Sequence, residues 1–289
     1  MTAKRIRTLY LALCLGAFAS CSSLFYHPSR VLHFPPEKFG ASPEEVNFRS
    51  GDGTHLFGWL FRHNATSRNS APKGVLLFYH GNAENLSSHY LSLLWLLKHG
   101  YDFFIFDYRG YGRSDGNPDP KGTKEDGEAA LRWLRARYPA APIVLYGQSL
   151  GGMVALRNAI DVKDETGIRA VVVHGGFASY QEVGRKVMAR GILTWPLQWL
   201  PWVVLSDRHA PDDGVVEVAP LPLLVMHSED DRVVPFSCGE RIYDLAGEPK
   251  EIWKIPGEGH TDAFQRYGDT YQKMLVDWLE RNASNSKKR

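Results

Sequence analysis

The stretch from Leu145 to Gly152, which reads LYGQSLGG, constrains the fold of this chain more than any other part of its sequence. It places Ser149 between two glycines directly after an apolar run. In a strand-to-helix turn of the GxSxG type, the glycines let the backbone turn sharply and expose the serine hydroxyl as a nucleophile. Because Gly and Ser are common residues, the pattern alone arises by chance in about one chain in ten of this length. Its meaning therefore depends on the residues that follow it.

Two later segments carry residue types that activate a serine. An acidic cluster, Glu229-Asp230-Asp231, follows an apolar run, and His260 ends the sequence GEGH. A serine hydroxyl is a weak nucleophile until a base takes its proton, and an imidazole base needs an acceptor for its second ring N–H. The chain order Ser, Asp, His is that of α/β-hydrolases and differs from the orders of chymotrypsin-like and subtilisin-like proteases.

Two earlier motifs extend this resemblance. His80-Gly81-Asn82 follows the apolar run 75–79, and the sequence DYRGYGRSDG at 107–116 follows the next run. Together with the GxSxG turn at Ser149, which we call the elbow, these motifs resemble the α/β-hydrolase superfamily. The resemblance is greatest to the BEM46-like serine hydrolases that include ABHD-type acyl-thioesterases. The resemblance covers residues 44–280. It implies an α/β-hydrolase fold and hydrolysis through an acyl-enzyme intermediate.

The resemblance also assigns roles to individual residues. Ser149 is the expected nucleophile, His260 the base, and Asp231 the acid that orients the base. Asp231 fits the family pattern HGxxDxxVP, although Ser228 stands where that pattern has Gly. Asp230 remains the alternative acid.

An oxyanion hole must accompany such a triad, because the tetrahedral intermediate needs preorganised donors. The elbow geometry supplies the backbone N–H of Leu150, and the resemblance implies the backbone N–H of Asn82 as the second donor. We expect structural roles for the neighbouring polar side chains His80, Asp107, Arg109 and His227. Cys238 is expected to be a small buried residue and not a competing nucleophile.

Strand and helix patterns alternate along the chain and predict one domain over residues 44–281. The sequence Gly51-Asp52-Gly53 predicts a hairpin between strands at 45–49 and 56–62. Buried parallel strands are expected at Val75–Tyr79, Asp102–Phe106, Ile143–Tyr146, Ala170–Val173, Leu223–Met226 and Ile252–Ile255. Helices are expected at Leu86–Lys98, Lys124–Tyr138, Leu150–Ile160, Cys238–Ala246 and Phe264–Arg281. The predicted class is α/β, with a mostly parallel central sheet flanked by helices.

One segment, at about 176–220, breaks this alternation and is expected to form a cap insertion before the strand that carries the acid. It contains the sequence WPLQWLPW. Trp195, Trp199 and Trp202 either form the wall of an acyl-binding pocket or pack the insertion onto the core, since Trp is usually buried.

The first residues resemble a secretory signal peptide of the lipoprotein type at 1–20, with basic residues before a short apolar run. Cys21 would become the lipidated N-terminus, and residues 21–43 would form a flexible arm between membrane and domain. The protein is expected to be located in the cell envelope, on the outer membrane if the cell is Gram-negative. Ordinary secretion and an uncleaved anchor remain alternatives. Residues 282–289 are expected to be a flexible tail.

Composition limits the remaining function classes. A net charge of +2 gives no case for nucleic-acid binding, which needs a concentrated basic face. No clustered His/Cys spacing predicts a metal site, and no cofactor is implied. The expected reaction is hydrolysis of a small-molecule ester or thioester. An aminopeptidase-like or amide hydrolase and a non-catalytic scaffold remain the alternatives.

Overall fold

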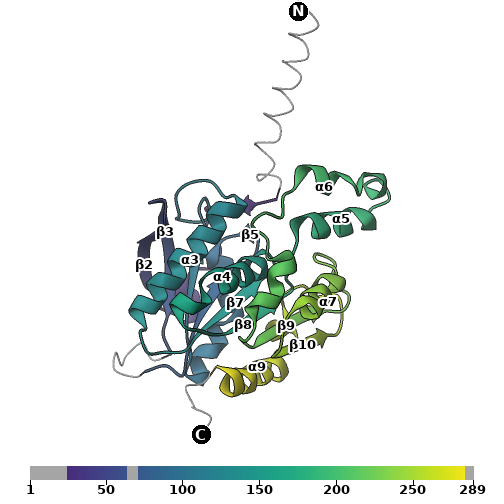
Figure 1. Ribbon diagram of the computed structural model, residues 1–289. Helices are drawn as coiled ribbons and strands as arrows, with labels where there is room; N and C mark the ends of the chain where they lie inside the picture. Colours follow the sequence, from purple (N-terminus) through teal and green to yellow (C-terminus); the bar gives the residue numbers. More distant parts are fainter. Residues whose placement is uncertain (1–24, 64–70, 284–289) are drawn as a thin grey trace, which may run out of the picture.

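The computed structural model describes residues 25–63 and 71–283 of the 289-residue chain. Its centre is an eight-stranded sheet in the order β10-β9-β8-β7-β4-β6-β3-β2 (Figure 1). The strands from β10 to β6 run parallel, and β3 is antiparallel to both β6 and β2. Their bounds are β2 Glu44–Arg49, β3 His55–Phe61, β4 Val75–Tyr79, β6 Asp102–Asp107, β7 Ile143–Gln148, β8 Ile168–His174, β9 Leu223–Ser228 and β10 Lys250–Ile255. The predicted hairpin, the six parallel strands and the α/β class are confirmed.

Successive side chains of the central strands face two different helical layers. In β4, Val75, Leu77 and Tyr79 belong to one core, whereas Leu76 and Phe78 belong to the other. The first core packs against α3 (Pro120–Arg137) and α4 (Leu150–Thr166), and the second packs against α9 (Asp269–Asn282). Because both faces of the sheet are covered, the middle strands are apolar at nearly every position.

Most of the predicted helices are present, with differences at their ends. The predicted start of α3 at Lys124 is late, because Asp119 caps the helix and Pro120 occupies its first turn. The predicted helix 264–281 is divided at Gly268, whose φ is 44°, into α8 (Ala263–Arg266) and α9. The helix α7 spans Phe236–Leu245.

The predicted helix 86–98 is a single helical turn, α2 (Leu86–His89), followed by two 3-10 segments, η3 (Tyr90–Ser92) and η4 (Leu94–His99). Side chains compete here with the regular helix bonds. The Ser88 hydroxyl donates to the Asn85 carbonyl at 3.0 Å, and the Trp95 indole donates to the Ser92 carbonyl at 2.8 Å. The prediction of one continuous helix is therefore wrong.

The segment from Phe25 to Pro43 packs against the domain. Its short strand β1 (His27–Pro28) pairs in parallel with β5 (Ala83–Glu84), and η2 (Pro36–Phe39) follows. Tyr26 is buried, and its hydroxyl lies 2.8 Å from the hydroxyl of Tyr180. The expectation of a flexible arm is therefore wrong for these residues. The predicted signal peptide (1–20), Cys21 and tail residues 284–289 lie outside the described residues.

The expected insertion lies between β8 and β9 and contains α5 (Tyr180–Arg190), η5 (Trp195–Leu197), α6 (Leu200–Val204) and η6 (Asp212–Val218). Helices α5 and α6 extend beyond the body of the domain, at the end of the molecule where the N-terminal segment enters it (Figure 1). Within the described ranges, none of the helices has the length and apolar character needed to span a bilayer.

Candidate active site

Ser149 occupies a sharp turn between β7 and α4. Its φ of 53° and ψ of −119° lie in a region that residues other than glycine rarely adopt. The Ser149 amide donates to the carbonyl of His174 at the end of β8, at 2.9 Å. Strain of this kind is typical of functional sites, where the surrounding structure maintains it. The turn matches the nucleophile elbow that the GxSxG pattern predicts.

Two glycines make this elbow possible for steric reasons. A Cβ atom on Gly147 would lie 2.4 Å from the carbonyl oxygen of Gly151. A Cβ atom on Gly151 would lie 2.1 Å from the carbonyl oxygen of Tyr79 on the neighbouring strand β4. Both distances are far below van der Waals contact, so neither position accepts a side chain without moving backbone.

The acid and the base meet directly. His260 Nδ1 lies 2.6 Å from Oδ2 of Asp231. The other carboxylate oxygen accepts the amide N–H groups of Val233 at 2.7 Å and Val234 at 2.9 Å. Asp231 is 1% exposed, whereas its neighbour Asp230 is exposed to solvent. The structure therefore brings Asp231, and not the alternative Asp230, to the imidazole.

Hydrogen bonds keep Asp231 ionised despite its burial. Burial alone would raise the pKa of this carboxyl, but hydrogen bonds from His227 and His260 hold the pKa well below its ordinary value. His227 Nε2 lies 3.4 Å from Oδ2 of Asp231 and 3.0 Å from the Val234 carbonyl oxygen. His227 thus organises the loop at 229–235 that carries Asp231, which we call the acid loop. This is the structural role predicted for His227.

His260 lies beside the elbow with one ring nitrogen unoccupied. A Cβ atom on Gly175 would be 3.1 Å from Cε1 of His260, and Gly175 directly follows His174, whose carbonyl holds the Ser149 amide. Among the described residues, His260 Nε2 is buried and has no hydrogen-bond partner. With Nδ1 bound to Asp231, Nε2 is the nitrogen through which this imidazole would accept a proton.

Two backbone amides lie at the elbow as candidate oxyanion donors. Leu150 is the first residue of α4, so its N–H has no acceptor within the helix. The segment Gly81-Asn82 lies beside the nucleophile, since a Cβ atom on Gly81 would be 3.7 Å from Cβ of Ser149. In the described part of the chain, the Asn82 amide N–H donates no hydrogen bond. Both amides thus lie near Ser149, and their role as oxyanion donors stays a prediction.

The Asn82 side chain and carbonyl are held by residues that were not predicted. The Asn82 amide group donates to the carbonyl of Phe25, and its oxygen accepts the backbone N–H of His27 at 3.1 Å. The Tyr111 hydroxyl donates to the Asn82 carbonyl at 2.7 Å. One signal was available in the sequence: a proline-containing segment without regular structure must still satisfy its buried backbone groups somewhere.

Other polar residues near the site have structural roles. The Asp107 carboxylate accepts the amides of Leu86 at 2.9 Å and Arg113 at 3.2 Å, and burial raises the pKa of Asp107 to about 7. Arg109 binds Asp126 through two nitrogens. His80 Nδ1 lies 2.7 Å from the Gly81 carbonyl oxygen. These contacts agree with the predicted roles in the turns beneath the site.

Cys238 is a poor alternative nucleophile. It is buried on α7, and burial raises the pKa of its thiol to about 11. Its thiolate is therefore scarce at neutral pH. Among the described residues, no group of three His, Cys, Asp or Glu side chains is arranged to hold a metal ion.

The three tryptophans of the cap face solvent. Trp195, Trp199 and Trp202 are 62%, 58% and 56% exposed, so they do not pack the insertion onto the core. No ring contact or hydrogen bond between described residues joins them to Ser149 or His260. Their expected part in an acyl-binding wall stays a prediction.

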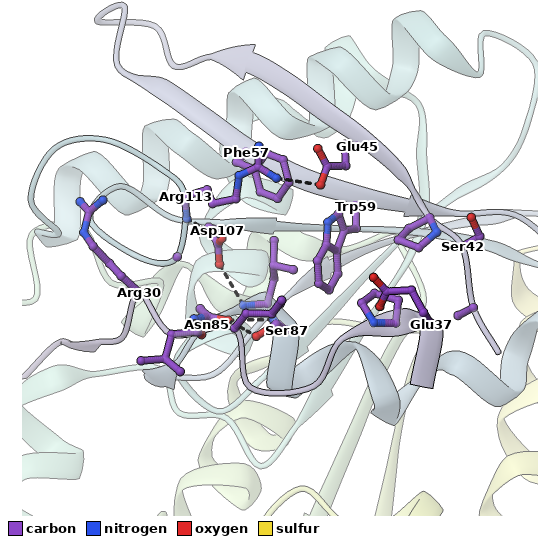
Figure 2. A pocket seen from close by; sticks show the side chains of 17 residues that line it. Arg30, Glu37, Ser42, Glu45, Phe57, Trp59, Asn85, Ser87, Asp107 and Arg113 are labelled. Carbon is purple, nitrogen blue, oxygen red and sulfur yellow. Dashed lines mark hydrogen bonds and ion pairs between the residues drawn. The ribbon is translucent and has the colours of Figure 1, made fainter. Parts of the chain in front are cut away.

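A cavity of about 530 Å³ lies away from the triad, between the N-terminal segment and the strands β2 and β3 (Figure 2). Labelled side chains around it include Arg30, Glu37, Glu45, Trp59 and Arg113. Arg113 binds Glu45 at 2.7 Å while its guanidinium lies 3.8 Å from the centre of the Phe57 ring. None of Ser149, Asp231 and His260 lines this cavity.

Comparison with known proteins agrees with the fold and the motifs. Residues 74–190 match the family model described as alpha/beta hydrolase fold. The chain is 35% identical over 261 residues to the protein YfhR of Escherichia coli (strain K12), covering 89% of this chain and 86% of that protein. It is 28% identical to the protein bem46 of Schizosaccharomyces pombe, covering 91% of this chain and 85% of that protein.

Two further similarities carry functional names. The lysophosphatidylserine lipase ABHD12 of Danio rerio is 32% identical over 186 residues, covering 62% of this chain and 48% of that protein. The esterase Pf2001 of Pyrococcus furiosus has the same fold, with a TM-score of 0.70 and 20% identity over 89% of this chain and 99% of that one. The chain therefore belongs to the α/β-hydrolase superfamily, in its BEM46- and ABHD-like group.

Proposed function

We propose that this protein is a serine hydrolase that cleaves a carboxylic ester or thioester through an acyl-enzyme intermediate. Ser149 is the nucleophile, His260 the general base and Asp231 the acid that orients it. The 2.6 Å contact between His260 Nδ1 and Asp231, beside an elbow that holds Ser149 at positive φ, carries this proposal.

The proposed reaction proceeds in two steps. The Ser149 hydroxyl attacks the acyl carbon while His260 Nε2 takes its proton, and the amides of Leu150 and Asn82 stabilise the oxyanion. The imidazolium then protonates the departing alcohol or thiol. Water, activated by the same imidazole, hydrolyses the acyl-enzyme and restores Ser149. Asp231 supports both steps because its carboxylate stabilises the charged imidazolium and fixes the tautomer.

An ester is the favoured substrate class. One relative is named a lipase and one structural neighbour an esterase, and the cap presents apolar side chains suited to acyl groups. We also propose that Cys21 is lipidated and attaches the protein to the cell envelope, as the layout of residues 1–21 indicates. Mass spectrometry of the mature N-terminus tests this address, and an unmodified peptide that retains residues before Cys21 contradicts it.

Replacement of the nucleophile tests the reaction. Ser149→Ala should abolish labelling by a fluorophosphonate probe and lower ester turnover by about six orders of magnitude, as loss of a triad nucleophile does in a serine protease. Cys238→Ala is the matched control and should leave both unchanged. Labelling that survives in Ser149→Ala, or that requires Cys238, would contradict the assignment.

A substrate panel separates ester hydrolysis from its alternatives. p-Nitrophenyl esters of increasing acyl length, acyl-thioesters and aminoacyl amides are compared by kcat/KM with the wild-type protein. Higher kcat/KM for esters or thioesters than for amides is expected. The opposite order would favour a peptidase, and no turnover of any substrate together with no probe labelling would favour a scaffold.

A further inference from the structure

The cap carries an unusual concentration of exposed apolar side chains. Between Val187 and Val203, eight large hydrophobic residues are exposed, and we call them the cap face: Val187, Ile192, Leu193, Trp195, Leu197, Trp199, Trp202 and Val203. Ile192 and Leu193 are 94% and 91% exposed. Soluble proteins rarely leave a contiguous apolar surface of this kind without a binding partner.

The charge pattern around the cap face fits an anionic bilayer. The sequence from Gly191 to Ser206 contains no charged residue, and Arg185, Arg190 and Arg208 flank it. Two other charged residues lie beside them: Asp207, whose carboxylate accepts from Ser179 and the Tyr180 amide, and Lys186, which is paired with Glu182. Arg185 and Arg208 form no ion pair with other described residues. An apolar tip with Trp side chains and a rim of Arg is typical of helices that lie in the membrane interface, where Trp is enriched and Arg attracts anionic headgroups.

The course of the chain places a membrane on the same side. The first described residue, Phe25, lies against Tyr180 at the start of α5, with ring centres 4.8 Å apart. Cys21 precedes Phe25 by four residues, a span of at most about 14 Å. The chain therefore leaves the domain beside α5. A membrane anchor at Cys21, or one that keeps the apolar run 9–19, would hold α5 close to the membrane. Figure 1 shows α5, α6 and the entry of the chain at one end of the molecule.

From these observations, we propose that the cap face docks onto an anionic phospholipid bilayer and inserts its Trp and aliphatic side chains among the headgroups. The anchor and the cap then form two contacts with one membrane. In this arrangement the cap faces the lipid. The cap is also bonded to the loop that carries Asp231, because Arg190 donates to the Asp231 carbonyl. Lipid-borne esters would thus reach the site from the bilayer. The docking itself does not depend on the proposed hydrolase chemistry.

Fluorescence quenching tests whether the cap face enters the bilayer. The full chain is bound to vesicles of phosphatidylcholine and phosphatidylglycerol whose acyl chains carry bromine, which quenches nearby tryptophan emission. The cap holds three of the eight tryptophans, and Trp59, Trp253 and Trp278 are buried. Vesicles should quench the wild-type protein, and joint replacement of Trp195, Trp199 and Trp202 by Phe should remove most of this quenching. Undiminished quenching in that variant overturns the proposal.

Charged substitutions at the tip provide the second test. The double variant Ile192→Asp, Leu193→Asp should lift the cap from the bilayer and remove most of the quenching. The matched control is Met274→Asp, another exposed apolar position, and it should quench like wild type. Met274 belongs to α9, a helix that Figure 1 shows at the opposite end of the molecule from α5 and α6. Because Ile192 and Leu193 lie almost wholly in solvent, the double variant should melt at the wild-type temperature. Equal quenching in the double variant and the control overturns the proposal.

Activity provides a separate measurement. The double variant should hydrolyse a vesicle-borne ester about tenfold more slowly than wild type and a soluble short-chain ester equally fast. Ser149→Ala should lose both activities and keep the wild-type quenching, so a failure of the proposed chemistry is distinguishable from a failure of docking. If instead the cap face binds a second copy of the chain, vesicles should not quench, and sedimentation should give a dimer that Leu193→Asp dissociates. That result would also overturn the proposal.

Discussion

The N-terminal segment Phe25–Pro43 and the cap Tyr180–Val218 both lie outside the central sheet, but they interact with the molecule in opposite ways. The N-terminal segment has little regular structure, yet its backbone is hydrogen-bonded to the loop Asn82–Asn85. The cap consists of helices, yet it leaves its apolar side chains in solvent. Regular structure is therefore a poor guide to how firmly a segment belongs to a fold, whereas satisfied backbone groups and buried side chains are good ones.

Each region contacts a different half of the candidate active site. The N-terminal segment holds Asn82, the candidate oxyanion donor. The cap holds the acid loop, since Arg190 at the end of α5 donates to the carbonyl of Asp231 at 2.8 Å and to that of Arg232 at 2.9 Å. Substitutions on the two sides should therefore differ in what they change.

The largest effect is expected on the cap side of the site. Asp231→Asn should lower kcat by about four orders of magnitude, because an amide stabilises the wrong imidazole tautomer. Asp230→Asn is the matched control, since Asp230 is exposed and its side chain is absent from the contacts around His260. Steady-state kinetics on one soluble ester measures both variants. A larger loss in Asp230→Asn would show that the acid has been assigned to the wrong residue.

The next effect is expected on the N-terminal side. Asn82→Ala keeps the backbone N–H but removes the side chain that binds Phe25 and His27. A misplaced oxyanion donor should lower kcat by up to about 100-fold, with KM for a soluble ester nearly unchanged. Tyr111→Phe, which removes the hydrogen bond to the Asn82 carbonyl, should shift kcat in the same direction by less. An unchanged kcat in Asn82→Ala would mean that the N-terminal segment does not position the donor.

A smaller effect is expected for the cap tryptophans. Trp199→Ala and Trp202→Ala should change the preference among acyl chain lengths by a few-fold and lower the melting temperature by less than about 2 °C, because exposed side chains contribute little to stability. Ester panels and thermal melts measure the two quantities. A large fall in melting temperature with equal losses for all chain lengths would instead indicate that these rings support the cap.

The last prediction concerns the pH dependence of stability. The pKa of Asp107, raised by burial to about 7, lies above its unfolded value, so the folded state binds this proton more tightly. Its contribution to stability is fully present below the unfolded pKa and is lost as pH rises toward 7. Asp107→Asn should remove this dependence, and its melting temperature relative to wild type should rise by a few degrees between pH 5 and pH 8. Parallel melting curves across that range would contradict the prediction.

The sequence predicts the parts of this molecule that depend on local pattern. The parallel strands follow from apolar runs, and the turn at Ser149 follows from the GxSxG pattern. The pairing of Asp231 with His260 follows from the resemblance to α/β-hydrolases. The contacts of Asn82 do not, because His27 precedes Asn82 by 55 residues and the pairing depends on the folded path of an irregular segment. The exposure of Trp199 was equally unpredictable, since composition favours burial for tryptophan.

The bond from Arg190 to the acid loop has a consequence for engineering. A chimera that exchanges the cap for that of a relative can be joined on either side of α5. A junction after Arg190 replaces the exposed apolar residues and keeps the hydrogen bond from Arg190 to the loop that bears Asp231. A junction before Tyr180 removes that hydrogen bond and also the Tyr180 hydroxyl, which is hydrogen-bonded to Tyr26. Only the first design changes the cap without disturbing the loop that bears Asp231. The part of the cap that can be exchanged therefore begins inside the insertion, after α5, and not at the edge of the sheet.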